Sequence, residues 1–215
     1  MSRSPDLART PGMTRTPRGY ALTKRLLDLT ICVAALPVLL PIGLLCAFLI
    51  RLESPGPILF AQQRTGQHGV RFPMFKFRTM VHNAEELKAS LQHLNILPAP
   101  DFKIPNDPRI TRIGKFLRKT SLDELPQILN VIRGEMSIVG PRPTSFAAST
   151  YDLWHSERLE VVPGITGLWQ IKGRGTMTFD ERLRLDIEYI ERRSTLLDLK
   201  LIAMTALAVF RGSGA

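Results

Sequence analysis

Between residues 76 and 142 the sequence contains the side chains that chemistry on phosphate groups requires. Phosphoryl transfer needs cations to neutralise oxygens, a metal ion to bridge them, and a carboxylate that holds the metal or attacks phosphorus. Asp123 and Glu124 form an adjacent carboxylate pair, and the basic side chains of this region include Lys76, Arg78, Arg109, Arg112, Arg118, Lys119 and Arg142. The sequence has neither a Walker lysine loop nor a G-x-G-x-x-G segment, so the common nucleotide-binding signatures are absent.

The same residues also have ordinary structural explanations. Ser121-x-x-Glu124 matches a helix capping box, in which Glu124 would only close the start of a helix. Asp123 in a first helical turn would complement the helix dipole. Basic patches also suit nucleic acid, but no recognised nucleic-acid motif is present, and we expect no nucleic-acid partner. Spacing alone leaves both the catalytic and the structural interpretation of the pair open.

The composition separates a basic, folded chain from an apolar segment. The 215 residues carry a net charge of +10 and are 44% hydrophobic, which excludes full disorder. Residues 29–50 contain no charged side chain, and Thr30 is the clearly polar one among them. A purely soluble protein is therefore not expected.

Two membrane arrangements compete for the apolar segment. Twenty-two residues at 1.5 Å each give a helix of about 33 Å, enough to cross a hydrocarbon core of about 30 Å. Pro37 and Pro41, however, each bend or break a helix. Both flanks are basic, with six basic and one acidic residue in 1–25 and five basic and one acidic residue in 51–78. A spanning helix strips positive charge from one side, so the flanks favour a re-entrant hairpin, while the length favours a span.

The remaining periodicity predicts mainly α structure with little β. Residues 70–80 alternate basic and apolar side chains, as in a strand. Helices are expected over 82–97, 110–117, from Ser121 to a cap at Gly134, over 179–193 and over 196–210. In the helix after Ser121 the buried stripe is expected to be Leu122, Leu125, Ile128, Leu129 and Ile132. Residues 141–143 and 163–167 are expected to be rigid loops.

Residues 107–143, DPRITRIGKFLRKTSLDELPQILNVIRGEMSIVGPRP, resemble the core signature of the bacterial sugar transferases. These are monotopic phosphoglycosyltransferases that act on polyprenyl phosphate. Further matches are Lys24-Arg25 with Asp28, Pro55-Gly56-Pro57, residues 76–80 (KFRTM) and residues 163–170 (PGITGLWQ). The resemblance covers about residues 20–215, with the motifs in order.

The resemblance implies an activity and a role for each site residue. Such an enzyme transfers a sugar 1-phosphate from a nucleoside diphosphate sugar to polyprenyl (undecaprenyl) phosphate, which initiates polysaccharide or glycoconjugate assembly. The family's catalytic pair maps onto Asp123 and Glu124, with Asp123 as the nucleophile of an aspartyl phosphosugar intermediate and both residues at the Mg²⁺ site. Phosphate contacts are expected from Lys76, Arg78, Arg118 and Arg142. The three arginines offer planar forks to phosphate oxygens, which a lysine cannot.

The resemblance also implies a location and a domain plan. It implies a re-entrant membrane helix (21–52) and a compact cytoplasmic catalytic domain with interfacial amphipathic helices (53–215). Residues 1–20 lie outside the resemblance, and their composition predicts a disordered basic arm. The protein is then expected at the bacterial inner membrane, in contact with membrane lipid, and a homo-oligomer is left open. One departure concerns the helix break, which is often Ser-Pro in the family but is Leu36-Pro37 here.

Two other interpretations remain open at this point. One is a non-catalytic, membrane-anchored protein whose basic face recruits acidic lipids or partners. The other is a single-span protein that exposes its basic domain. No motif identifies the sugar, the nucleotide or the polymer.

Overall fold

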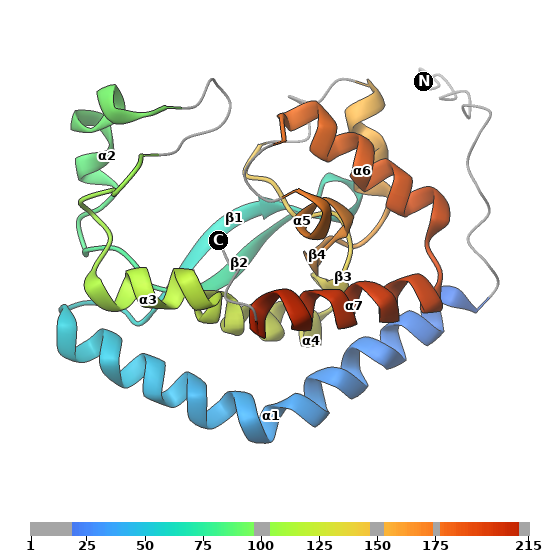
Figure 1. The fold of residues 1–215 in the computed structure, drawn as a ribbon, viewed down its shortest axis with the longest axis horizontal. Helices are drawn as coiled ribbons and strands as arrows, with labels where there is room; N and C mark the ends of the chain where they lie inside the picture. The colour runs from blue at the N-terminus through green and yellow to red at the C-terminus, as the bar shows by residue number, and fades with distance from the viewer. Residues whose placement is uncertain (1–18, 97–103, 147–152, 174–176, 211–215) are drawn as a thin grey trace, which may run out of the picture.

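Helix α1 (Tyr20–Glu53) is the longest element of the structure, a computed structural model that describes residues 19–96, 104–146, 153–173 and 177–210. It contains Pro37 and Pro41, and Figure 1 shows it bent in its middle, with the bend directed away from the rest of the protein. Within the described residues, it is the one helix long and apolar enough to cross a membrane. Apart from Gly19 and Tyr20, the predicted basic arm lies outside the described residues.

The chain after α1 forms an antiparallel hairpin of β1 (Leu59–Thr65) and β2 (Arg71–Phe77), joined through the 3-10 turn η1 (Gln67–Gly69). The strand predicted at 70–80 is therefore confirmed. Phe72 and Met74 of β2 are buried with Cys32 of α1 and with Val131 and Met136. The hairpin thus packs onto α1 through apolar side chains of β2.

The predicted helix over 82–97 is mostly wrong. The structure has a five-residue helix α2 (Glu86–Ser90) and a 3-10 turn η2 (Gln92–Leu94) there. Leu87 and Leu94, two of the side chains expected on the buried face, are exposed. Helical spacing alone does not hold a short helix together when its apolar face has no partner to pack against.

Helix α3 (Arg112–Thr120) is confirmed, with the Thr111 side chain accepting from the Gly114 amide as its N-cap. The predicted helix after Ser121 is instead a 3-10 segment η3 (Leu122–Gln127) followed by α4 (Ile128–Arg133). A 3-10 segment has about 3.0 residues per turn instead of the 3.6 of an α-helix, so the side chains after it point in other directions than a continuous α-helix would give them. Leu129 and Ile132 are therefore exposed, against the prediction. The cap at Gly134 is confirmed, with φ of 82°.

The C-terminal part stacks short strands and helices above α1. Strand β3 (Ser137–Val139) pairs in parallel with β4 (Gly164–Thr166), so the predicted loop at 163–167 is partly a strand. Between them lies the 3-10 segment η5 (Leu153–Glu160). Helices α5 (Leu168–Lys172), α6 (Phe179–Arg192) and α7 (Thr195–Phe210) follow, and the last two agree with the predicted helices.

Polar contacts attach both halves of α1 to the rest of the protein. Near its start, Arg25 donates to the carbonyl oxygens of Val131 and Ile132 at the end of α4, and the buried Asp28 accepts from the Ile138 amide at 3.1 Å. At its end, Glu53 accepts from the Arg112 and Ile113 amides (2.7 and 3.0 Å) at the start of α3.

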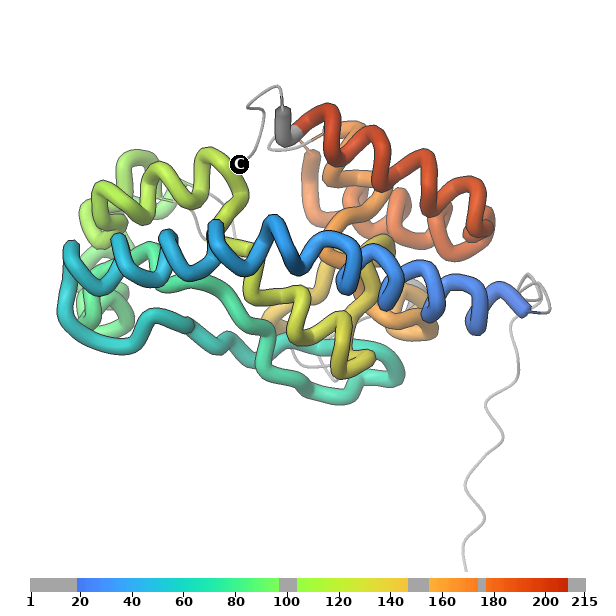
Figure 2. The backbone as a smooth tube through the Cα atoms, turned by 90° about the horizontal axis from the view of Figure 1, so that it is seen from below, coloured from blue at the N-terminus to red at the C-terminus, as the bar shows by residue number. Residues whose placement is uncertain are grey.

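A buried polar cluster adds a further attachment near the start of α1. Asp198 of α7 accepts from Tyr20, Lys24 and Tyr189 at 2.8–2.9 Å. Figure 2 shows α1 lying across α3, α4 and α7, all of which it contacts. The bent helix is therefore fastened at both ends to the domain that contains the acidic pair.

Candidate active site

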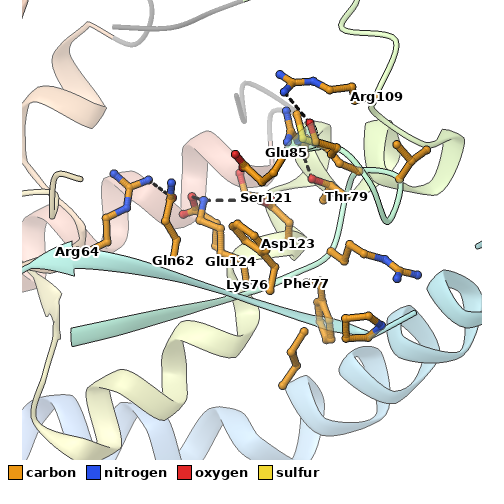
Figure 3. A pocket seen from close by; sticks show the side chains of 18 of the residues that line it. Gln62, Arg64, Lys76, Phe77, Thr79, Glu85, Arg109, Ser121, Asp123 and Glu124 are labelled. Atoms are coloured by element: carbon orange, nitrogen blue, oxygen red, sulfur yellow. Dashed lines mark hydrogen bonds and ion pairs between the residues drawn. The ribbon is translucent and has the colours of Figure 1, made fainter. Parts of the chain in front are cut away.

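A cavity of about 730 Å³ opens above the β1–β2 hairpin. Its walls come from the hairpin, the segment after β2, α3, η3, the loop at 141–143 and α5. All six predicted site residues line it: Lys76, Arg78, Arg118, Asp123, Glu124 and Arg142. Figure 3 shows Lys76, Asp123 and Glu124 side by side over the hairpin.

A tight turn at Ser121 places both carboxylates at the cavity. Ser121 has a φ of 57°, a left-handed conformation that ends α3 and turns the chain into η3. The following 3-10 residues put Asp123 and Glu124 on the side of the cavity, while Pro126 and Gln127 are buried behind them. The acidic pair is thus presented by a short rigid segment between two helices.

The capping-box interpretation of Glu124 is wrong. Ser121 makes no side-chain cap hydrogen bond to η3, and the Glu124 amide bonds to the Ser121 carbonyl oxygen instead. The reason is the left-handed backbone of Ser121, since an N-cap residue needs an extended one. The Glu124 side chain is left to interact with groups across the cavity.

Two cations hold Glu124 in its ionised form. Its Oε1 atom lies 2.9 Å from Lys76 Nζ and 2.5 Å from Arg142 Nη2. Burial by itself would raise the pKa of Glu124, but the charges of Arg142 and Lys76 outweigh it and hold the pKa well below its usual range. Glu124 is therefore expected to be ionised at neutral pH, and it pairs with both cations.

Asp123 has a different environment from its neighbour. It is 8% exposed, and its Oδ2 atom lies 3.8 Å from Lys76 Nζ. Burial raises the pKa of Asp123 above its usual value, Lys76 opposes the rise, and the charge of Glu124 adds to it. The pair thus combines one firmly ionised carboxylate with one that is held less tightly and is more basic.

The loop at 141–143 supplies Arg142 from the far side of the cavity. Arg142 lies between Pro141 and Pro143, which restrict its backbone. Its carbonyl oxygen accepts from Arg158 Nη2 at 2.5 Å, and Arg158 in turn lies 2.7 Å from the buried Asp186. The guanidinium that faces Glu124 is therefore supported from behind by a second, buried ion pair.

Arg78 and Arg118 line the cavity, but protein groups already engage them. Arg78 donates to the carbonyl oxygens of Ser54 and Pro55 (2.7 and 2.8 Å), and its guanidinium lies where a side chain on Gly56 would have to be. Arg118 Nε donates to Thr79 at 2.9 Å. Arg78 thus closes the turn after α1, and a phosphate contact from either arginine stays a prediction.

The cavity also contains residues that the sequence analysis did not select. Gln62 and Arg64 of β1 form a 2.5 Å hydrogen bond beside Glu124 (Figure 3). Their spacing of two places both side chains on one face of a strand, which would have identified them had β1 been predicted. Trp169 and Gln170 of α5 also line the cavity, from the segment 163–170 of the resemblance.

Asp123 and Glu124 are also the residues that could hold a divalent cation. No group of three or more His, Cys, Asp or Glu side chains is arranged for a metal within the described residues. Mg²⁺ does not need such a group, because it is commonly bound by one or two carboxylates together with substrate phosphates and water. Two adjacent carboxylates facing a cation-lined cavity fit that pattern.

Comparison with known proteins establishes the family of the chain. The family model "Bacterial sugar transferase" matches residues 19–212. The chain is 44% identical over 200 residues to the galactosyl transferase CpsE of Streptococcus agalactiae, covering 91% of the chain and 44% of that protein. It is 40% identical over 203 residues to the undecaprenyl-phosphate galactose phosphotransferase of Salmonella typhimurium, covering 92% and 42%.

A shorter relative is matched along most of its length. The exopolysaccharide production protein ExoY of Sinorhizobium fredii is 40% identical over 199 residues, covering 89% of the chain and 88% of that protein. The chain thus spans less than half of the first two relatives and most of the third. It belongs to the bacterial sugar transferase family.

Proposed function

We propose that the protein transfers a sugar 1-phosphate from a nucleoside diphosphate sugar to polyprenyl phosphate at the cytoplasmic face of the membrane. The observation that carries the proposal is the acidic pair Asp123 and Glu124, which faces a cavity with Lys76 and Arg142 and lies close to the apolar helix α1. The name of the Salmonella relative, a phosphotransferase acting on undecaprenyl phosphate, supports a lipid phosphate acceptor.

Asp123 acts as the nucleophile in this proposal. A carboxylate oxygen of Asp123 attacks the sugar-linked phosphorus, and the bond to the bridging oxygen breaks, releasing the nucleoside monophosphate. An oxygen of the lipid phosphate then attacks the same phosphorus and displaces Asp123, which leaves a polyprenyl diphosphate sugar. Dividing the transfer into two steps lets one site handle a water-soluble donor and a membrane acceptor in turn.

The charges around Asp123 support this role. Its raised pKa accompanies greater basicity, which favours attack once the group is ionised, and Lys76 keeps the ionised form accessible. Arg142 offers a planar fork on the opposite side for the phosphate oxygens. A Mg²⁺ ion held by Asp123 and Glu124 would neutralise the diphosphate and stabilise the leaving nucleotide.

The membrane part of the proposal rests on α1 and the helices beside it. Exposed apolar side chains continue from α1 onto the neighbouring helices, at Phe116, Leu129, Ile132, Leu196 and Leu207. Such faces suit the interface between head groups and acyl chains. The bend at Pro37 and Pro41, with basic residues before and after α1, supports a re-entrant helix with both ends in the cytoplasm.

The test is donor labelling in the absence of acceptor. Purified protein is incubated briefly with nucleotide sugars labelled in the sugar, with Mg²⁺ and without lipid, and the protein is then denatured. Wild type is expected to retain labelled phosphosugar, to release nucleoside monophosphate, and to lose the label when undecaprenyl phosphate is added. Asp123→Asn is expected to retain no label while keeping its fold.

Glu124→Gln tests the second carboxylate in the same assay. It is expected to lose orders of magnitude in turnover and to respond to added Mg²⁺. Asp180→Asn, on the exposed start of α6, serves as the control that keeps wild-type labelling. Label on Asp123→Asn, or normal turnover of wild type without any labelled protein, would rule out the covalent step. Turnover of no nucleotide sugar at all would favour the non-catalytic interpretation.

A further inference from the structure

A second, smaller cavity lies between α1 and the acidic pair. It has a volume of about 240 Å³ and is enclosed by α1, η3, α4, β3, β4 and α7. Four of its lining residues come from the middle of α1, at Ile31, Cys32, Ala35 and Leu39. Their spacing places them on one side of the helix, just before and around Pro37.

The two cavities meet at the acidic pair. Ser121 and Glu124 line both of them. From this shared boundary, the larger cavity extends over cations and carboxylates, whereas the smaller one extends over aliphatic side chains toward α1. A polar compartment and an apolar compartment therefore adjoin each other at Ser121 and Glu124.

The lining of the smaller cavity is mostly apolar and therefore suits a hydrocarbon ligand. Apart from the two shared residues, its polar lining side chains are Cys32, Thr166 and Thr205, and the two threonine hydroxyls bond to each other at 2.7 Å. Thr205 also bonds to the Leu201 carbonyl oxygen. Hydroxyls that are already paired do not favour water over an apolar ligand.

We propose that this cavity holds the isoprene unit next to the phosphate of the polyprenyl phosphate acceptor. The inference rests on the proposed function, because it assumes that the lipid phosphate reacts beside Glu124. In a polyprenyl phosphate the hydrocarbon begins directly at the phosphate ester. A lipid phosphate in the polar compartment therefore needs an apolar compartment immediately beside it, and this is the arrangement around Glu124.

Geometry separates this ligand from an ordinary phospholipid. A glycerophospholipid places a glycerol backbone and two polar esters between its phosphate and its acyl chains. Those esters would lie in the smaller cavity, where the described hydroxyls are already paired. The cavity volume of about 240 Å³ is several times the roughly 30 Å³ that one water molecule takes in the liquid. The cavity therefore has room for a small branched hydrocarbon such as one C5 unit.

Two neighbouring alanines of α1 provide a matched pair of variants. Ala35 lines the cavity, whereas Ala34 is exposed on the outer side of the same helix. Ala35→Leu is expected to fill the cavity and to raise the KM for undecaprenyl phosphate about tenfold or more, equivalent to about 1.4 kcal/mol. The KM for the nucleotide sugar is expected to stay unchanged, and Ala34→Leu is expected to behave as wild type.

A second pair keeps the test valid if Ala35→Leu misfolds. Ile128 of α4 lines the cavity, and its neighbour Leu129 is exposed. Ile128→Phe is expected to raise the KM for the lipid, and Leu129→Phe is not. Equal effects within both pairs would overturn the proposal, because the change would then not depend on the cavity.

Photolabelling separates this inference from the proposed activity, because it requires no turnover. The probe is a farnesyl phosphate with a diazirine in the isoprene unit next to the phosphate. Label is expected on peptides containing Ala35, Ile128 or Ile165, is expected to fall about tenfold in Ala35→Leu, and is expected to be displaced by undecaprenyl phosphate.

The outcomes of photolabelling are distinct. Cavity label without turnover would support the site and count against the transfer reaction, whereas turnover with label confined to the outer face of α1 would overturn the site alone. Equal displacement by phosphatidylglycerol would also overturn it, since the cavity would then accept any lipid.

Discussion

Arg142 Nη2 lies 2.5 Å from Glu124 Oε1, so the arginine predicted to bind phosphate is already paired with a carboxylate of the acidic pair. Lys76 shares the same oxygen. A substrate diphosphate entering the cavity would therefore meet cations whose positions Glu124 has fixed beforehand. Such preorganisation lowers the cost of binding charge in the reaction.

Arg142→Lys keeps the charge but loses the planar fork toward Glu124 and phosphate. We expect kcat/KM to fall roughly 10- to 100-fold, or about 1.4–2.8 kcal/mol of transition-state stabilisation. The thermal midpoint should change little, because the side chain is partly exposed and its carbonyl contact to Arg158 is retained. Arg184→Lys, on the exposed face of α6, is the matched control. Unfolding of Arg142→Lys with full activity in the folded fraction would mean that the arginine is structural.

Lys76→Met should move the acid limb of the pH–rate profile to higher pH. The Lys76 charge lowers the pKa of Asp123 against the effect of burial, and attack requires Asp123 to be ionised. Without that charge the pKa rises, so activity is lost at a higher pH as the solution is acidified. The expected shift is about one pH unit or more, measured as kcat/KM for the donor. Lys115→Met, exposed on α3, should leave the limb in place, and a shift of Lys76→Met toward lower pH would contradict the assignment.

The ion pair behind Arg142 makes a prediction about stability. Asp186 is 1% exposed, and burial raises its pKa to about 7, although Arg158 lies 2.7 Å away. Its folded pKa is above the unfolded value of about 3.9, so the native state holds the proton more tightly. The resulting stabilisation is fully present below about pH 4 and is lost as the pH rises through about 7, by up to about 4 kcal/mol.

Asp186→Asn should remove this pH dependence. Urea unfolding at pH 4.5, 6 and 8 should show a smaller decline in the free energy of unfolding for the variant than for wild type. Asp180→Asn, on the exposed start of the same helix, should keep the wild-type decline. An unchanged slope in Asp186→Asn would show that Asp186 is ionised throughout this range.

The bend in α1 predicts the topology. Single cysteines replacing the exposed residues Ala21 and Val70 should both resist a membrane-impermeant maleimide in intact cells and both react after lysis. The protein without introduced cysteines, whose Cys32 and Cys46 are buried, is the negative control. Replacing Pro37 and Pro41 together by Leu should make one of the two sites react from outside. Reaction of one introduced cysteine from outside while Pro37 and Pro41 are still present would show a spanning helix instead.

Asp123, Glu124, Lys76 and Arg142 could be selected from the sequence because they lie in motifs that resemble those of the bacterial sugar transferases, and all four line one cavity. The interpretation of Glu124 as a helix cap failed because the left-handed backbone of Ser121 cannot be read from residue types alone. Similarly, Arg78 could be placed near phosphate chemistry by composition, but its contacts to Ser54 and Pro55 depend on how the chain turns after α1.

In the fold, likewise, elements defined by a local sequence pattern could be predicted, whereas elements that depend on contacts between distant parts of the chain could not. Long periodic segments such as α6 and α7 were predicted, because the pattern repeats over several turns. Strands β3 and β4 were not predicted, because each has only three residues and the two paired strands are far apart in the sequence. The assignment of Leu129 and Ile132 to the buried face assumed one continuous α-helix, and it failed because the 3-10 segment before α4 changes the helical phase.

The attachments at both ends of α1 have a consequence for quality control of the protein in the cell. Arg25 and Asp28 fasten the first half of the bent helix to α4 and β3, and Glu53 fastens its end to the start of α3. Between α3 and α4 lies η3, which carries the acidic pair. If the helix straightened across the bilayer, one set of attachments would have to break, and the segment holding Asp123 would lose a support. Under the proposed function, a molecule inserted in the wrong topology would thereby be inactive from the start, so it would not consume nucleotide sugar without access to the lipid acceptor.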